Sequence, residues 1–491
     1  MPFKKNVPAK TKKQEPKPVK EKIKPVAPRP AKGTSTFQLL RGMKDILPVD
    51  APYWKLLRDT AEKLADHFGY QAIETPILEP RDLFVRGVGK QTDIVEKEMY
   101  AFVDAGGDNV VLRPEGTASV VRAYIEHGML NLPQPIKLFY QGPMFRHDRP
   151  QQGRYRQFHQ VCCEALGDQH PVIDAELISL CYSFFQELGL PVVIKLNSLG
   201  CPACREIYRN ELVNYYRSKR SLLCSNCKER LNRNPLRLLD CKEPGCEMVK
   251  ESAPQMLDKL DEACHNHFFK VIEYLDDLGL PYSINPYIVR GLDYYNRTVF
   301  EIFPDKSGQV KNVEEVKGDD KSLPDPPFAK GREPLSLKKG IEGDLPAQSA
   351  LAGGGRYDGL AELLGGRPTP GVGFAIGLER VVTFMKETGV VPPPLPAPKV
   401  FIAQLGESAR RKSLALYHKL RGKVRVAASF SKDGLKPQLE IANRLGVRYT
   451  LIIGQKEVLD ETVIIRDMEA GIQEVTAYDK VAGEMERRLN N

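Results

Sequence analysis

The chain contains no run of apolar residues close to the roughly 18 that a membrane-spanning helix needs. Its first residues also lack the apolar stretch of a secretory signal and the Ser and Arg enrichment of a transit peptide. Ten cysteines without such a signal favour reduced thiols. We therefore expect a cytoplasmic protein.

Several common catalytic motifs are also missing. The chain has no G-x-x-x-x-G-K-[ST] loop, so any use of ATP is not of the P-loop kind. It has neither H-E-x-x-H nor G-x-S-x-G, which removes the common zinc-protease and serine-hydrolase classes. The segment GVGFAIG (371–377) approaches the dinucleotide-binding fingerprint, but its glycine spacing is wrong and no preceding strand-to-helix unit supports it.

Excess positive charge is confined to one end of the chain. The formal net charge is +9, and residues 1–33 alone carry ten Lys and one Arg against two Glu, so the rest is formally neutral. Polyanion binding by the body must therefore come from local patches. Residues 1–35 are rich in Lys and Pro, and we expect a disordered tail. The tail is either a tether that promotes encounter with RNA or a solubilising segment without a partner.

The most informative local patch is a basic hairpin, LFYQGPMFRHDRPQQGRYRQFHQ (138–160). Its two strand-forming segments flank a loop that carries Arg146, Arg149, Arg154 and Arg156. Because the arginine fork binds phosphate with two parallel hydrogen bonds, the hairpin suits a triphosphate or a nucleic-acid end. A solvated hairpin without a ligand is the alternative.

Other arginines stand beside glycines or aromatic residues in distant segments. Arginine neutralises phosphates without reacting, which fits nucleotidyl transfer by positioning and charge stabilisation. Each such arginine alone would more often form a surface ion pair. Several together favour a shared phosphate site, and the candidates are Arg113, Arg146, Arg290, Arg356 and Arg380.

Composition and periodicity divide the body of the chain. Residues 36–196 and 282–390 alternate helical patterns with strand-like runs and glycine loops, and we expect one core from both. The composition of the polar segment 304–349 within this core predicts a flexible insert. The strand-like run 71–78 contains Pro76, which favours an edge or interface position for that strand.

The remaining segments differ in character. Residues 197–281 hold paired cysteines in a charged, largely helical pattern, which indicates an inserted domain. The Pro-rich linker 391–399 marks a boundary. Beyond it, strands and helices alternate over 400–491, as in a small α/β domain with a mostly parallel sheet.

Seven motifs carry a family resemblance from about Gln38 to the C-terminus. They are RGMKDILP (41–48), FGYQAIETPILEP (68–80), LRPEGTASVVRAY (112–124), FRHDRPQQGRYRQFHQ (145–160), VRGLDYYNRTVFE (289–301), GGRYDGL (354–360) and GVGFAIGLER (371–380). In kind and order they resemble histidyl-tRNA synthetase, a class II aminoacyl-tRNA synthetase. The hairpin and GLER motifs are shared by many class II enzymes, whereas RGLDYYNRTVFE and RPEGT are much more specific.

The resemblance implies an α+β catalytic domain, with an antiparallel sheet and flanking helices of the class II synthetase type. It adds a helical insertion domain, a C-terminal α/β anticodon-binding domain and a homodimer with the segment around Pro76 at the interface. The implied activity is ATP-dependent attachment of L-histidine to tRNA(His) through histidyl-adenylate, with Mg²⁺ on the phosphates. A non-catalytic paralogue, the regulatory subunit of ATP phosphoribosyltransferase, is the alternative, although it normally lacks the C-terminal domain.

Residue roles follow from the same resemblance. Arg146 and Arg290 are the expected catalytic arginines at the α-phosphate of ATP, Arg380 should hold the γ-phosphate, and Phe158 should stack on adenine. The expected histidine-binding residues are Glu115, Thr117 and Gln160 for the α-amino group, Glu164 and Tyr295 for the imidazole, and Tyr294 on the pocket wall. Arg149 and Gln151 should meet the tRNA acceptor end.

Two departures from the family pattern lie near this set. Asp148 stands where the hairpin usually carries Glu, and Cys162 occupies a position that is usually small. Neither removes a residue that the chemistry requires.

The cysteines of the insertion leave a question open. The C-x₂-C pairs Cys201/Cys204 and Cys224/Cys227 have zinc spacing, with Cys241 and Cys246 as further candidates. Structural zinc and small buried thiols are both compatible with this pattern.

Overall fold

The computed structural model describes residues 37–151, 153–305 and 350–490. The predictions for the tail 1–35 and for nearly all of the insert 304–349 lie outside these residues. Among the described residues, no helix has both the length and the apolar character that crossing a membrane requires.

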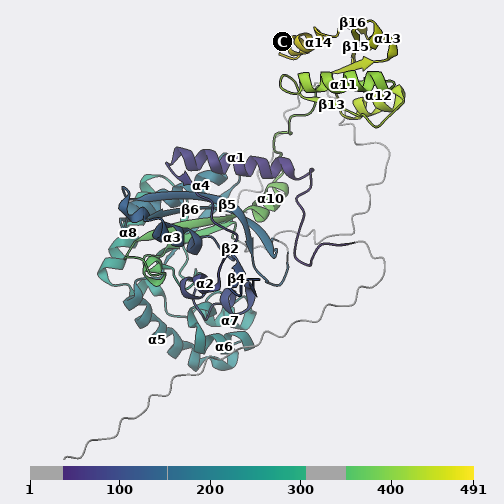
Figure 1. Cartoon of the computed structure of the whole chain (residues 1–491). Coiled ribbons are helices and arrows are strands. Elements are labelled where there is room, and N and C mark those ends of the chain that lie inside the picture. The colour runs from purple at the N-terminus through teal and green to yellow at the C-terminus, as the bar shows by residue number, and fades with distance from the viewer. Residues whose placement is uncertain (1–36, 152, 306–349, 491) are drawn as a thin grey trace, which may run out of the picture. The chain divides into compact units, whose positions relative to one another are not determined.

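A large sheet forms the centre of the catalytic region (Figure 1). Every pairing from β5 to β7 is antiparallel and both edge pairings are parallel, which confirms the predicted antiparallel sheet apart from its edges. In spatial order the strands are β1 (Gln71–Ala72), β5 (Ile136–Phe145), β6 (Gln157–Leu166), β11 (Gly371–Gly377), β10 (Ala352–Arg356), β9 (Asn296–Pro304), β7 (Val192–Ser198) and β8 (Tyr282–Ile284).

Long helices cover one face of this sheet and bury its larger apolar side chains. In the first helix, Trp54, Leu57, Ala61 and Leu64 recur at helical spacing and are buried against the sheet. Each such Leu contributes about 1.5–3 kcal/mol by leaving water. The covering helices are α1 (Ala51–His67), α4 (Pro171–Glu187), α8 (Glu262–Asp277) and α10 (Leu378–Glu387).

The opposite face carries shorter elements, and α2 and α3 lie there, away from α1 and α4 (Figure 1). The run 71–78 is not one strand, because it divides into β1 and β2 with Pro76 between them. The elements of this face are β2 (Leu78–Pro80), α2 (Arg81–Gly87), the π-helix η1 (Ile94–Glu98), β3 (Tyr100–Val103), β4 (Asn109–Leu112), α3 (Thr117–Glu126), η2 (Met129–Asn131) and α9 (Leu360–Leu363).

The cysteine-rich segment is helical, as its pattern indicates. Its last helix, α8, packs on α4 and places Phe268, Val271 and Leu275 in the core under the sheet. The helix α8 therefore shares the core of the catalytic region, and the predicted end of the insertion at residue 281 stays a prediction. The elements before α8 are α5 (Pro202–Ser218), η3 (Arg220–Leu222), α6 (Ser225–Arg233), η4 (Pro235–Leu238), α7 (Pro244–Lys250) and η5 (Met256–Lys259).

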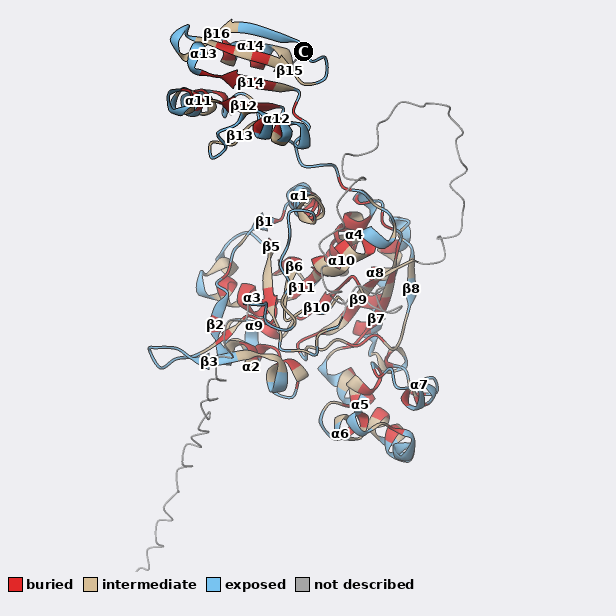
Figure 2. Cartoon of the chain, turned by 90° about the vertical axis from the view of Figure 1, so that its right-hand side faces the viewer, coloured by how far each residue is buried: buried red, intermediate tan, exposed pale blue. Residues whose placement is uncertain are grey.

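Residues 400–490 build their own five-stranded sheet (Figure 2). It has a separate apolar core on each face. The pairings of β12 with β13 and β14 are parallel, but β15 and β16 add antiparallel pairings, so the sheet is mixed and not mostly parallel. The elements are β12 (Val400–Gln404), α11 (Glu407–Leu420), β13 (Val426–Ala428), α12 (Leu435–Arg444), β14 (Tyr449–Ile453), α13 (Gln455–Leu459), β15 (Thr462–Asp467), β16 (Gln473–Ala477) and α14 (Val481–Asn490).

Candidate active site

Strand β6 supplies one side of the candidate site. Phe158, Gln160, Cys162 and Glu164 are two residues apart, so their side chains point to the same face of the sheet. The alternate residues of β6 point into the core under the helical layer; they are Val161, Cys163 and Ala165. The face with the site is therefore the one that the long helices leave free.

Small residues on the neighbouring strands make room above this face. Gly373 and Gly377 of β11 lie opposite Glu164 and Gln160. A Cβ at Gly373 would lie 1.6 Å from Glu164 Oε2, and one at Gly353 of β10 would lie 2.4 Å from Arg290 Nη1. A side chain at either position would therefore displace Glu164 or Arg290.

Glu164 is the centre of a buried hydrogen-bond network. Its carboxyl group contacts Thr117 Oγ1 at 2.7 Å, Tyr140 OH at 2.9 Å and Tyr357 OH at 2.5 Å. Burial raises the pKa of Glu164 to about 8, against the opposing effect of these hydroxyls. The carboxyl group therefore holds a proton at neutral pH.

Glu115 is the second buried carboxylate of the site. It accepts hydrogen bonds from the backbone N–H groups of Thr117 (2.8 Å) and Ala118 (2.9 Å) at the start of α3, and Tyr294 OH donates to it at 3.2 Å. Burial raises its pKa. Thr117 therefore links the two buried carboxyl groups, through its backbone N–H to Glu115 and through its hydroxyl to Glu164.

Two tyrosines and an arginine from the RGLDYYN segment complete the pocket wall. The rings of Tyr294 and Tyr295 are 4.7 Å apart. The Arg290 guanidinium lies 5.2 Å from the Tyr295 ring centroid, and its Nη1 pairs with Glu301 at 2.8 Å. This arrangement places a permanent cation directly beside the candidate amino-acid pocket.

Two further arginines lie on the same side. Arg146 donates from Nε to the carbonyl of Pro114 at 2.8 Å, and its guanidinium lies 5.3 Å from the Phe158 ring centroid. Arg380 donates to the carbonyls of Gly153 (3.0 Å) and Ala350 (2.6 Å).

The electrostatics of these arginines favour an anionic ligand. Burial, followed by repulsion from Arg154 and Arg146, lowers the pKa of Arg380 to about 10. Burial also lowers the pKa of Arg146, with a further contribution from Arg290. Cations that destabilise one another in a buried site would be stabilised by a bound polyanion.

The predicted tRNA-contacting residues lie at the exposed tip of the hairpin. Arg149 is exposed, and its backbone N–H donates to Asp148 Oδ1 at 2.6 Å. Gln151 is also exposed and forms an isolated bridge with Arg154. Both therefore stand apart from the buried network around Glu164.

Two arginines of the predicted phosphate set have structural partners instead. Arg356 is fully buried, contacts Asp174 through Nε at 3.1 Å and pairs with Asp358 at 3.1 Å, so it cannot meet a phosphate. Arg113 is buried and donates to the carbonyls of Pro143 and Thr75 at 3.1 and 2.9 Å. The prediction was wrong for Arg356, because its partner is distant in sequence.

Tyr140 and Tyr357 belong to the site although the sequence does not single them out. Tyr140 lies opposite Cys162 in the β5–β6 register, and Tyr357 follows β10 directly. The only sequence signal is their place inside the LFYQG and GGRYDGL motifs. Their role depends on contact with Glu164, which spacing alone does not show.

The candidate metal ligands fall into two groups in space. Cys224 and Cys227 lie with Cys241 and Cys246, whereas Cys201 and Cys204 lie with Asp261 and Cys264. The two C-x₂-C pairs therefore do not form one site together. Cys264 and Asp261 were not expected as candidates, since neither has zinc spacing to another cysteine.

Comparisons with known proteins agree with this geometry. Residues 42–311 match the family model of histidyl-tRNA synthetase, and residues 399–488 match that of an anticodon binding domain. The histidine–tRNA ligase of Dehalococcoides mccartyi strain 195 is 43% identical over 455 residues, which are 92% of this chain and 100% of that protein. The one from Pelotomaculum thermopropionicum is 42% identical, over 90% of this chain and 95% of its own.

A solved structure gives the same result. Apo histidyl-tRNA synthetase from S. aureus superposes with a TM-score of 0.68 at 33% sequence identity, covering 92% of this chain and 100% of that one. The family model and the full-length relatives span the same region as the sheet, the pocket and the C-terminal domain. The chain belongs to the histidyl-tRNA synthetase family.

Proposed function

We propose that this protein is a histidine–tRNA ligase, which attaches L-histidine to tRNA(His) through histidyl-adenylate with ATP as the energy source. The observation that carries the proposal is the position of the carboxyl groups of Glu115 and Glu164 next to the arginines at 146 and 290. One sheet face thus offers an amino-acid pocket and a polyanion site side by side.

Histidine recognition follows from the buried network. Glu115 and Thr117, with Gln160 beside them, are suited to the α-amino group, because a carboxylate, a hydroxyl and an amide oxygen accept hydrogen bonds. Glu164 and Tyr295 are suited to the two imidazole nitrogens. A pocket built on hydrogen bonds to its substrate discriminates by ~10⁴ or more against analogues that lack them.

The ionisation of Glu164 fits this role. At neutral pH its carboxyl group is protonated, and the imidazole of free histidine is mainly neutral, with one N–H group and one unprotonated nitrogen. The carboxyl proton can be donated to the unprotonated imidazole nitrogen, so binding requires no net proton exchange. This matches the pocket to the charge of its substrate at cellular pH.

The arginines account for ATP activation. A histidine carboxylate oxygen attacks the α-phosphorus, the bond to the leaving pyrophosphate breaks, and Arg146 and Arg290 stabilise the charge on the α-phosphate. Arg380 holds the γ-phosphate and Phe158 stacks on adenine. The phosphates would themselves hold Mg²⁺, which offsets their charge, and the carboxylate of Glu301 beside Arg290 offers a further oxygen ligand.

The second step transfers the histidyl group to tRNA. The terminal ribose hydroxyl attacks the activated carbonyl and adenylate leaves, while Arg149 and Gln151 at the hairpin tip meet the acceptor end. Residues 400–491 bind the anticodon. We further propose a homodimer, which works in the cytoplasm.

ATP–pyrophosphate exchange tests the proposal. Purified protein with Mg²⁺ and each of the twenty amino acids in turn should exchange with histidine alone. Histidine binding without any exchange would contradict the proposal and favour a regulatory paralogue. Nothing in the described part of the chain favours that alternative.

A further inference from the structure

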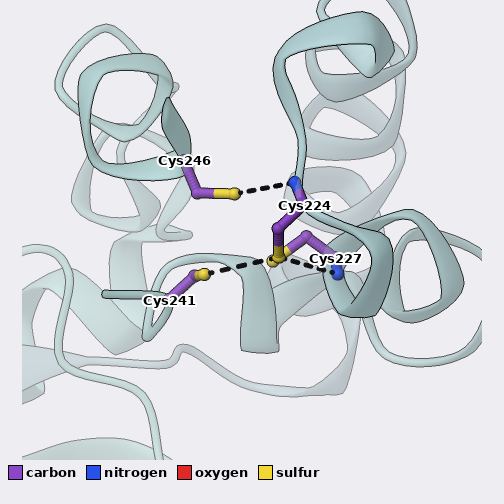
Figure 3. Close-up of side chains that lie close together, drawn as sticks. All are labelled: Cys224, Cys227, Cys241 and Cys246. Carbon is purple, nitrogen blue, oxygen red and sulfur yellow. Dashed lines mark hydrogen bonds between the residues drawn. The ribbon is translucent and has the colours of Figure 1, made fainter. Parts of the chain in front are cut away.

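We propose that Cys224, Cys227, Cys241 and Cys246 form a structural site for one Zn²⁺. Their four Sγ atoms all lie within 4.8 Å of one another, and the side chains converge from separate segments (Figure 3). Tetrahedral zinc with Zn–S bonds of about 2.3 Å places its sulfurs about 3.8 Å apart. The distance between Cys224 Sγ and Cys241 Sγ is 3.9 Å.

The backbone around the cluster favours thiolates. The Cys224 N–H donates to Cys246 Sγ at 3.3 Å, and the Cys227 N–H donates to Cys224 Sγ at 3.4 Å. Cys224 is the N-cap of α6, so the positive end of that helix faces the sulfurs. Both features stabilise negative charge where a metal would require deprotonated ligands.

The chemistry of the donor set selects the ion. Four thiolates in tetrahedral reach are soft ligands, which favour zinc or iron–sulfur chemistry over hard cations. All ten cysteines are free, so no disulfide accounts for the cluster. Iron–sulfur clusters insert sulfides between the thiolates and need wider spacing, whereas one ion fills this space. Four protein ligands leave no open position, which is typical of a structural site.

The surrounding segment is built from short elements. Its elements η3, α6, η4 and α7 have three, nine, four and seven residues, lengths at which isolated helices are marginal in water. The ligands come from the start of α6, the turn after η4 and the first turns of α7. A bound ion would therefore join three short pieces of the chain to one another.

The segment in turn contacts the outer side of the histidine pocket. Arg230 Nη2 lies 3.1 Å from Asp93 Oδ2, and Asn234 Nδ2 donates to Asp293 Oδ1 at 3.1 Å. Asp293 directly precedes Tyr294 of the pocket wall. A zinc ion bound here would therefore help to hold α6 in position, and α6 in turn supports this wall.

The second cysteine group has a local explanation. Asp261 caps α8 by accepting the Cys264 N–H at 2.7 Å, and the Cys201 thiol donates to its other carboxylate oxygen at 3.1 Å. Both oxygens are thus occupied within the protein. We therefore expect one zinc per chain, and Cys201 offers a matched control.

Metal analysis of the full-length protein, purified without a histidine tag under reducing conditions, tests the proposal. We expect about one zinc per chain in the wild type, loss of at least tenfold in Cys241→Ser, and full retention in Cys201→Ser. Absence of zinc, iron in its place, or loss in Cys201→Ser with retention in Cys241→Ser would overturn it.

A second measurement covers the case in which Cys241→Ser does not fold. X-ray absorption at the zinc edge of the wild-type protein should show four sulfur neighbours at about 2.3 Å. A shell of mixed sulfur and oxygen ligands would instead point to the group with Asp261 and would contradict the proposed site. Cobalt(II) exchanged for zinc should show the thiolate charge-transfer bands of a tetrahedral site.

Discussion

At the scale of single residues, the protonation of Glu164 controls what the pocket can bind. The carboxyl group is 1% exposed and its pKa is raised to about 8 by burial. A carboxyl group that stays protonated can donate to an imidazole nitrogen, whereas an ionised one cannot. The hydroxyls of Tyr140, Tyr357 and Thr117 hold it in one orientation. Affinity for histidine should therefore depend on one proton at this position.

Histidine affinity should pass through a maximum near neutral pH. Above about pH 8 the free protein loses the Glu164 proton. Below about pH 6.5 the imidazole of free histidine gains a second proton, which the already protonated carboxyl group of Glu164 cannot accommodate. Calorimetric titration across this range measures both limbs. Glu164→Gln should bind more weakly and lose the decline between about pH 7 and 8.5. An unchanged upper limb in that variant would assign the titration to another group.

Gly373 provides a steric test of the same pocket. Alanine there would place a Cβ 1.6 Å from Glu164 Oε2, so the carboxyl group must move. We expect Gly373→Ala to weaken histidine binding by about 10- to 100-fold, equivalent to about 1.4–2.7 kcal/mol. Gly377→Ala on the same strand is the matched control, because its Cβ would meet nothing closer than 3.8 Å. Equal losses in both variants would show that the loss comes from a general disturbance of β11 and not from contact with Glu164.

At the scale of elements, the β5–β6 hairpin separates two tasks along its length. Arg146 directly follows β5 and lies half-buried beside Phe158, whereas the tip of the loop carries the exposed Arg149. Lysine cannot reproduce the two parallel hydrogen bonds of an arginine fork. Arg146→Lys should lower pyrophosphate exchange about 10²- to 10³-fold. Arg149→Lys should leave exchange near the wild-type rate and weaken tRNA charging. If Arg149→Lys lowered pyrophosphate exchange and Arg146→Lys affected only tRNA charging, the two proposed roles would have to be exchanged.

Periodicity predicts those elements whose determinants are local. The helix α1 follows from apolar residues three and four apart, and the antiparallel hairpin from its two flanking runs. The alternation in GVGFAIG, read with the register, also explains why Val372, Phe374 and Ile376 face the helices and the small residues face the site. Here local pattern and tertiary packing agree.

Long-range pairing limits prediction from sequence. The fixed partner of Arg356 is Asp174, which lies on α4, and no spacing rule connects two such distant residues. The cysteines of the insertion show the same limit, since their division into two groups depends on how short helices fold back. Tyr140 and Tyr357 join the site only because the sheet register brings them to Glu164.

At the scale of the whole molecule, the apolar cores show how the chain can be divided. Two buried clusters draw on residues before 390, and two others draw only on residues after 399. A segment with its own core can fold alone. The two partial reactions should therefore separate when the chain is cut at the Pro-rich linker.

Removal of residues 391–491 tests this division. The residues proposed to bind histidine and ATP, Glu164, Arg146, Arg290 and Arg380, all precede the cut. The shortened chain should therefore keep histidine-dependent pyrophosphate exchange within about threefold. By contrast, kcat/KM for tRNA(His) should fall at least about 100-fold, or about 2.7 kcal/mol. The excised segment 399–491, expressed alone, should fold cooperatively and bind tRNA weakly. Loss of exchange in a well-folded shortened chain would show that the C-terminal segment supports the histidine pocket as well as the tRNA.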